Sequence, residues 1–196
     1  KDHIVTPEGE GDDLLAVTLG LRRGEICGLS WNDIDFERNI VDISHSYDNL
    51  GNLKGTKIKA GMRLLPLSPV TKDALLKMKE AQAAQFAKTN SFRKPEEGYL
   101  EQTEDGPVIA GHYGERVQSG TMSRWWSVDR KEFGLEGYTL HELRHTYLTM
   151  LAMGGVHPKV MQELASHYSS QITMDIYTHV NMDAKRAAVD AVSKLF

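Results

Sequence analysis

A single β-rich stretch, residues 33–68, constrains this fold most, because the other apolar segments of the chain repeat with helical spacing. Its first half contains the β-branched run Ile40-Val41-Asp42-Ile43-Ser44, and its second half contains an apolar run from Met62 to Leu67. Between these runs, residues 47–56 are rich in Asn and Gly, which favour turns. We therefore predict a small antiparallel sheet with a long hairpin loop over residues 33–68.

Helical segments are predicted on both sides of this sheet. Before it, residues 14–21 form an apolar helix, and residues 22–31 form a shorter amphipathic stretch. After it, Thr71 and Asp73 are candidate caps for the next helix, and residues 90–106 form a polar, acidic connector. The helices predicted after the sheet are 71–89, 120–133, 140–153, 158–165 and 183–196. The expected fold class is α+β, mostly helical, with one small antiparallel sheet.

Cysteine content and hydropathy indicate the compartment. Cys27 is the one cysteine of the chain, so no internal disulfide can form, and a reducing cytoplasm fits best. No apolar run approaches the roughly 18 residues that cross a bilayer, and the chain opens without a secretory leader. We expect a cytoplasmic protein without a membrane partner.

The formal net charge of −4 argues at first against a nucleic-acid partner. The charge is unevenly distributed, however. Residues 1–13 carry −4 and residues 96–105 carry −5, which leaves +5 for the rest of the chain. Residues 52–72 contain five basic side chains and no acid. A solvated loop is the more common explanation of such a run on its own, so charge alone leaves DNA as an open possibility.

Residues 141–145, His-Glu-Leu-Arg-His, have two chemical interpretations. As HExxH, the pattern places two imidazoles on one helix face with a Glu between them, which is typical of zinc hydrolases. Glu163 is the one acid at a suitable sequence distance for a third ligand, and Arg144 would disfavour a nearby metal. As HxxR, the pattern instead places His141 and Arg144 on one face, where together they suit a phosphate.

Four short boxes decide between these interpretations by their order and spacing. The first is Gly20-Leu21-Arg22-Arg23-Gly24-Glu25, and the second runs from Thr56 to Arg63. The third is His141-Glu142-Leu143-Arg144-His145, and the fourth joins Leu164-Ala165-Ser166-His167 to Asp175-Ile176-Tyr177. Over about residues 14–180 the chain resembles the tyrosine recombinases, the phage integrase family. The residues of these boxes look most like those of the integrases of phages and conjugative transposons.

The resemblance implies a metal-independent DNA strand transferase that works without a cofactor. It identifies Tyr177 as the nucleophile that forms a 3′-phosphotyrosine, and Arg22 and Arg144 as ligands of the scissile phosphate. Lys57 would protonate the departing 5′-oxygen. Lys57 and Lys59 compete for this role, and the Lys-x-Lys-x-x-x-Arg spacing of the family favours Lys57.

The same resemblance assigns proton transfer to His141, a phosphate hydrogen bond to His167 and orientation of the first box to Glu25. It implies residues 14–182 as the catalytic domain, behind a tail of residues 1–13. Core-binding and arm-binding domains, which family members carry before the catalytic domain, are expected to be absent from this chain. The partner is double-stranded DNA, bound as a homotetramer in which helix 183–196 could pass to a neighbouring protomer. A DNA-binding module of this fold that has lost catalysis is the third alternative, after the zinc hydrolase.

Overall fold

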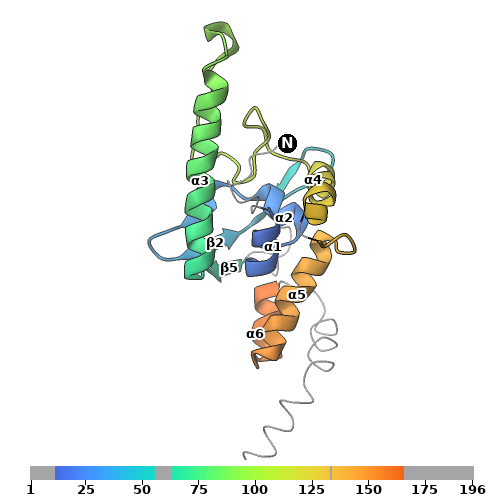
Figure 1. The fold of residues 1–196 in the computed structure, drawn as a ribbon. Coiled ribbons are helices and arrows are strands. Elements are labelled where there is room, and N and C mark those ends of the chain that lie inside the picture. Colours follow the sequence, from blue (N-terminus) through green and yellow to red (C-terminus); the bar gives the residue numbers. More distant parts are fainter. Residues whose placement is uncertain (1–11, 56–62, 133, 166–196) are drawn as a thin grey trace, which may run out of the picture.

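The computed structural model describes residues 12–55, 63–132 and 134–165 (Figure 1). The helices are α1 (Asp12–Leu19), α2 (Arg23–Gly28), α3 (Pro69–Asn90), α4 (Ser119–Glu132), α5 (Leu140–Met153) and α6 (Pro158–Ala165), with the 3-10 turns η1 (Trp31–Asp33) and η2 (Pro95–Glu97). The strands are β1 (Ile34–Asp35), β2 (Ile40–Ile43), β3 (His45–Tyr47), β4 (Leu53–Gly55) and β5 (Arg63–Pro66). The predicted α+β, mostly helical class is confirmed. The predicted helix 183–196 lies outside the described residues.

The strands form two small antiparallel sheets, where the sequence predicted one. Strand order is β1-β2-β5 in the first sheet, and the predicted return strand pairs with β2 so that Val41 lies opposite Leu65. The second sheet pairs β3 with β4, and β4 lies within residues 47–56, the stretch that was predicted as turn. The Asp48 carboxylate accepts hydrogen bonds from the backbone N–H of Leu50 and Asn52, at 2.8 and 2.9 Å. This tight reversal lets residues 53–55 pair with residues 45–47.

Helix α3 begins earlier than predicted. The Ser68 hydroxyl accepts from the Thr71 backbone N–H at 3.1 Å, and Pro69 occupies the first turn. Ser68 is therefore the cap, and the assignment of Thr71 or Asp73 was wrong, because proline suits the first helical position and pushes the start upstream. Figure 1 shows α3 projecting beyond the rest of the molecule.

The connector after α3 is bonded back to the body at several points. The Asn90 side chain bonds both backbone groups of Leu100, and the backbone N–H of Trp31 donates to the Gly106 carbonyl at 3.1 Å. The Trp31 indole, buried in the core, donates to Gln82 Oε1 at 2.8 Å. No helix in the described part of the chain is both long and apolar enough to span a bilayer.

The core lies between α1, α2, the three-stranded sheet and α5. Leu15 and Leu19 of α1 are buried, and α1 packs along α5. Cys27 is fully buried with its Sγ 3.6 Å from Met122 Sδ, as expected for a small core residue. This packing brings the start of α2 beside the start of α5, although the two are more than 100 residues apart in sequence.

Candidate active site

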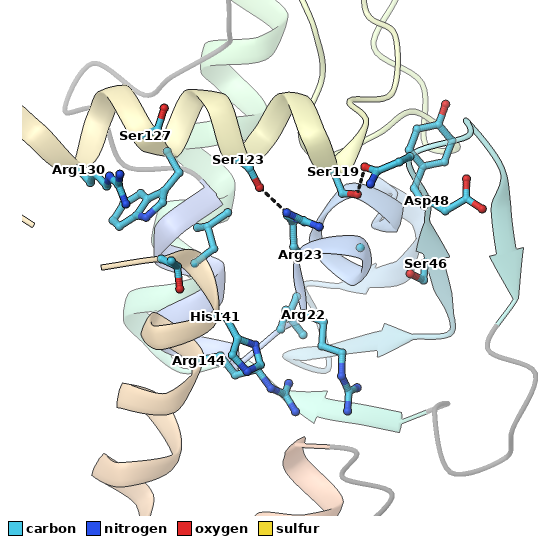
Figure 2. A pocket seen from close by; sticks show the side chains of 17 residues that line it. Arg22, Arg23, Ser46, Asp48, Ser119, Ser123, Ser127, Arg130, His141 and Arg144 are labelled. Atoms are coloured by element: carbon cyan, nitrogen blue, oxygen red, sulfur yellow. Dashed lines mark hydrogen bonds between the residues drawn. The ribbon is translucent and has the colours of Figure 1, made fainter. Parts of the chain in front are cut away.

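A pocket of about 690 Å³ lies where α2, β3, α4 and α5 meet (Figure 2). It is lined by residues of the first and third boxes of the sequence, and its basic lining side chains are Arg22, Arg23, Arg130, His141 and Arg144. Asp48 is the acid among the described lining residues, and it forms an ion pair with Lys54 at 2.5 Å. The lining therefore carries an excess of positive charge and suits an anion.

Arg22 occupies the N-cap position of α2 and is held there by Glu25. Its backbone N–H donates to Glu25 Oε2 at 2.8 Å, and its Nη1 donates to Glu25 Oε1 at 2.9 Å. The Glu25 side chain is buried, whereas that of Arg22 is 43% exposed. The guanidinium is thus anchored on one side and accessible on the other, as a ligand of a bound anion has to be.

A second arginine shares the Glu25 carboxylate. Arg63 Nη1 and Nη2 donate to Glu25 Oε1 and Oε2 at 3.1 and 3.0 Å. Burial raises the Glu25 pKa, but the hydrogen bonds and charges of Arg63 and Arg22 outweigh it, so the net pKa is lowered. Glu25 therefore remains a carboxylate at neutral pH.

Arg144 lies almost completely buried beside Arg22. It donates hydrogen bonds to the carbonyl oxygens of Gly20 and Ala165. Burial, followed by the charge of Arg22, lowers the Arg144 pKa to about 10, so the side chain is still charged at neutral pH. The two carbonyls fix the guanidinium rigidly, which is the preorganisation that electrostatic catalysis requires.

His141 is the third predicted site residue in this pocket, and Figure 2 shows its ring beside the guanidinium groups of Arg22 and Arg144. Its Nε2 lies 3.2 Å from Nε2 of His145, one helical turn later. Burial, then the charges of His145, Arg144 and Arg22, lower the His141 pKa below 6.5. His141 is thus neutral at pH 7 and able to accept a proton.

Glu142 has a structural role that the HExxH interpretation did not anticipate. Its carboxylate accepts from the Thr139 backbone N–H at 2.5 Å, and its own N–H donates to Thr139 Oγ1 at 3.3 Å. This is a capping box at the start of α5. Glu163 lies 3.8 Å from Lys159 on α6. In the part of the chain that the structure describes, no three His, Cys, Asp or Glu side chains cluster as metal ligands. The carboxylates of Glu142 and Glu163 are engaged instead with Thr139 and Lys159.

Comparison with known proteins places this pocket in a family. The model of the phage integrase family matches residues 14–184, which is most of the chain. The chain belongs to the phage integrase family. Its fold agrees with solved members: a Tn1549 transposon integrase in complex with transposon right end DNA superposes with a TM-score of 0.65 at 25% identity, over 92% of this chain and 57% of that one.

Curated relatives from the phage integrase family include recombinases and transposases. A "Tyrosine recombinase XerC-like" protein from Caldanaerobacter subterraneus subsp. tengcongensis is 31% identical over 93% of this chain and 48% of its own length. The transposase of transposon Tn916 from Enterococcus faecalis is 27% identical over 92% of this chain and 44% of its own length. The chain spans about half the length of the curated relatives it matches.

The structure places three of the six predicted phage integrase residues around one pocket, namely Arg22, His141 and Arg144. The other three, Lys57, His167 and Tyr177, lie outside the described residues. The contacts of Arg63 were missed, although the residue stands in the acid-free run 52–72. A buried basic residue needs a partner, but the sequence does not show which of the 27 acids supplies it.

Proposed function

We propose that this chain is the catalytic domain of a site-specific DNA recombinase that integrates and excises a mobile element. The observation that carries the proposal is the convergence of Arg22, Arg144 and His141 on one positively lined pocket. Family membership supports the reaction class, and the DNA-bound transposon integrase with the same fold supports DNA as the substrate.

The chemistry that this site suits is transfer of a phosphodiester to a hydroxyl group. A pentacoordinate phosphorane carries more negative charge than the phosphodiester from which it forms. Preorganised guanidinium groups at Arg22 and Arg144 would bind that added charge, and loss of one such donor typically costs about 10²–10³ in rate. These cations are side chains, which agrees with the proposed metal-independent reaction.

In the proposed reaction, the Tyr177 hydroxyl oxygen attacks phosphorus and loses its proton while the bond from phosphorus to the 5′-oxygen breaks. Lys57 supplies a proton to that oxygen, which leaves a 5′-hydroxyl group and a 3′-phosphotyrosine. A tyrosine of ordinary pKa near 10 needs help from a base or nearby cations, and neutral His141 can take part in that proton transfer. His167 would donate a hydrogen bond to the phosphate. Attack by another 5′-hydroxyl then rejoins the strands.

The proposed partner is double-stranded DNA at the ends or attachment sites of the element. Strand exchange between two duplexes needs four active sites, so we propose a homotetramer on DNA. Residues 183–196 are the segment proposed to pass between protomers. The proposed place of action is the bacterial cytoplasm, where the chromosome and mobile elements meet.

A covalent trap tests the proposed function. The 196-residue chain is incubated with nicked duplexes that are randomised on both sides of the nick, so that cleavage releases a short fragment and prevents rejoining. We expect a protein–DNA adduct that survives detergent and EDTA and whose DNA, once sequenced, shows a common site. Tyr177→Phe should abolish the adduct.

Tyr99→Phe is the matched control, because Tyr99 is exposed in the connector and does not line the pocket. An adduct that persists in Tyr177→Phe would refute the nucleophile assignment. Sequence-specific binding without any adduct would identify a DNA-binding module that has lost catalysis, and peptide cleavage that EDTA abolishes would favour the zinc hydrolase.

A further inference from the structure

The buried side chain of Arg63 joins two elements that flank the pocket residues. Arg63 begins β5, and its side chain is only 7% exposed. It forks onto both oxygens of Glu25 in α2, and its Nε donates to the Leu164 carbonyl of α6 at 2.8 Å. A bidentate guanidinium–carboxylate pair of this kind is among the stronger polar contacts in proteins.

The same Glu25 carboxylate also accepts both hydrogen bonds from Arg22. Each of its oxygens is therefore shared between Arg22 and Arg63. One negative charge is divided between two guanidinium groups, and the three side chains together keep one net positive charge. Without Arg63, the buried carboxylate and Arg22 would form a pair with no net charge.

This balance matters because Arg22 lines the pocket and Glu25 does not. An arginine whose charge is cancelled by a buried carboxylate attracts a phosphate weakly, since attraction between charges at low dielectric is strong and favours the internal pair. We propose that Arg63 is a positioning residue, which neutralises part of Glu25 and so keeps the charge of Arg22 available to the scissile phosphate. This role of Arg63 rests on the proposed function, because it concerns how strongly the same site binds the scissile phosphate.

The contact with Leu164 gives Arg63 a second effect on the same site. Arg63 and Arg144 bind the adjacent carbonyls of Leu164 and Ala165, the last two residues of α6. The final carbonyls of a helix have no partner within it, and cations near that end are favourable. Arg63 thus connects the Arg22 box to the end of α6, two positions before His167 in the sequence.

The first experiment measures anion binding and needs no DNA site. Inorganic phosphate is titrated into the chain, and the arginine Nε–H resonances of Arg22 and Arg144 are followed by NMR. We expect Arg63→Met to weaken phosphate binding roughly 10- to 100-fold, the range of coupling between contacting charged groups. Replacing Glu25 as well, in Arg63→Met/Glu25→Gln, should recover much of the loss, because the carboxylate that captures Arg22 is gone.

The second experiment measures the rate of adduct formation with the duplex recovered from the trap, at saturating DNA. Arg63→Met should slow this rate, and the slowing should diminish at mildly acidic pH. Without Arg63, Arg22 remains as the neighbour that lowers the Glu25 pKa against the effect of burial, so this pKa should rise. Protonation of Glu25 at falling pH would then release Arg22. Arg63→Lys keeps the positive charge but loses the bidentate hydrogen bond to Glu25. Its rate of adduct formation should lie between those of Arg63→Met and wild type.

Arg116→Met is the matched control for a purely structural effect. Arg116 is also a partly buried arginine, bonded to the carbonyls of Cys27 and Leu29, but it does not line the pocket. The Arg116→Met substitution should lower the melting temperature, but it should change neither the phosphate affinity nor the rate of adduct formation of the folded protein.

The two experiments separate the two proposals. Wild-type phosphate affinity in folded Arg63→Met, or no recovery in the double variant, overturns the role of Arg63. If the phosphate results are as expected but no duplex in the pool is cleaved by wild type, the recombinase function fails while the charge-sharing role of Arg63 stands as a property of an anion site.

Discussion

At the scale of single residues, Gly20 sets the position of Arg144. Its φ of +61° is strained for any residue with a side chain, and a Cβ atom there would collide with the ring of Tyr147. Its carbonyl is also one of the two acceptors of the Arg144 guanidinium. The short segment between α1 and α2 therefore has to be glycine at this point if Arg144 is to keep its place.

We predict that Gly20→Ala lowers the free energy of unfolding by about 2–4 kcal/mol, combining backbone strain with overpacking. Gly155→Ala is the control, because Gly155 has a similar φ of +73° but nothing within 4 Å of the added methyl group. Gly155→Ala should lower the free energy of unfolding only by the cost of the left-handed backbone conformation, about 1–2 kcal/mol. Urea unfolding of both variants measures the difference, and equal losses would contradict the role of Tyr147.

The pKa of His141 is a second prediction at this scale. Burial and the neighbouring charges of His145, Arg144 and Arg22 lower it, and the carboxylate of Glu142 opposes them only in part. His145→Gln removes one of the lowering contributions, so the His141 pKa should rise toward 6.5. An NMR titration of the ring nitrogens measures this, with His112→Gln as a control, and an unchanged value in His145→Gln would contradict the coupling.

At the scale of elements, the start of α5 shows how one pattern can satisfy two interpretations. The capping box of Thr139 and Glu142 fixes where the helix begins, and so places His141 in the first turn and Arg144 in the second. Thr139→Ala should cost about 1 kcal/mol of stability, the usual value for a lost cap. Thermal unfolding measures this loss.

Glu142→Gln provides the functional counterpart of this prediction. Glutamine can keep the capping box, so stability and adduct formation should stay near wild type. In a zinc hydrolase the same change would remove the general base and abolish activity. Loss of adduct formation in folded Glu142→Gln would show that the carboxylate does more than cap the helix.

Elements with strong periodicity could be predicted from the sequence, and those that depend on a specific turn or on distant partners could not. Residues 140–153 and 158–165 have clear helical spacing and end signals, and the structure has those bounds. Strand β4 was missed because residues 47–56 contain mainly turn residues, and only the Asp48 turn makes pairing with β3 possible. The Arg63 contact with Leu164 spans 101 positions, beyond any local pattern.

At the scale of the whole molecule, the described charges are separated in space. Figure 1 shows the acidic connector leaving the far end of α3, whereas α5 and α6 lie at the opposite end of the molecule. A helix of 22 residues such as α3 is about 33 Å long. This exceeds the Debye length of about 10 Å at 0.1 M salt several-fold. Glu96 and Glu97, just beyond the far end of α3, therefore act little on the pocket. Glu104 lies nearer the body, where it pairs with Lys79 of α3 at 3.0 Å. A net charge of −4 thus does not exclude binding of DNA at the pocket.

Salt dependence of DNA binding tests this separation directly. With a short duplex of arbitrary sequence, we expect weak binding that falls steeply as salt rises, because counterions are released from each phosphate that the protein neutralises. Arg22→Gln should lower the slope of log K against log salt by about 1, the value for one lost phosphate contact.

Lys77→Gln also removes one positive charge, but Lys77 is exposed on α3, 3.4 Å from Asp73 and away from the pocket. If DNA responds to the pocket rather than to total charge, the slope of Lys77→Gln stays at the wild-type value. Equal slopes for the two variants would show that only total charge matters and that DNA does not enter the pocket.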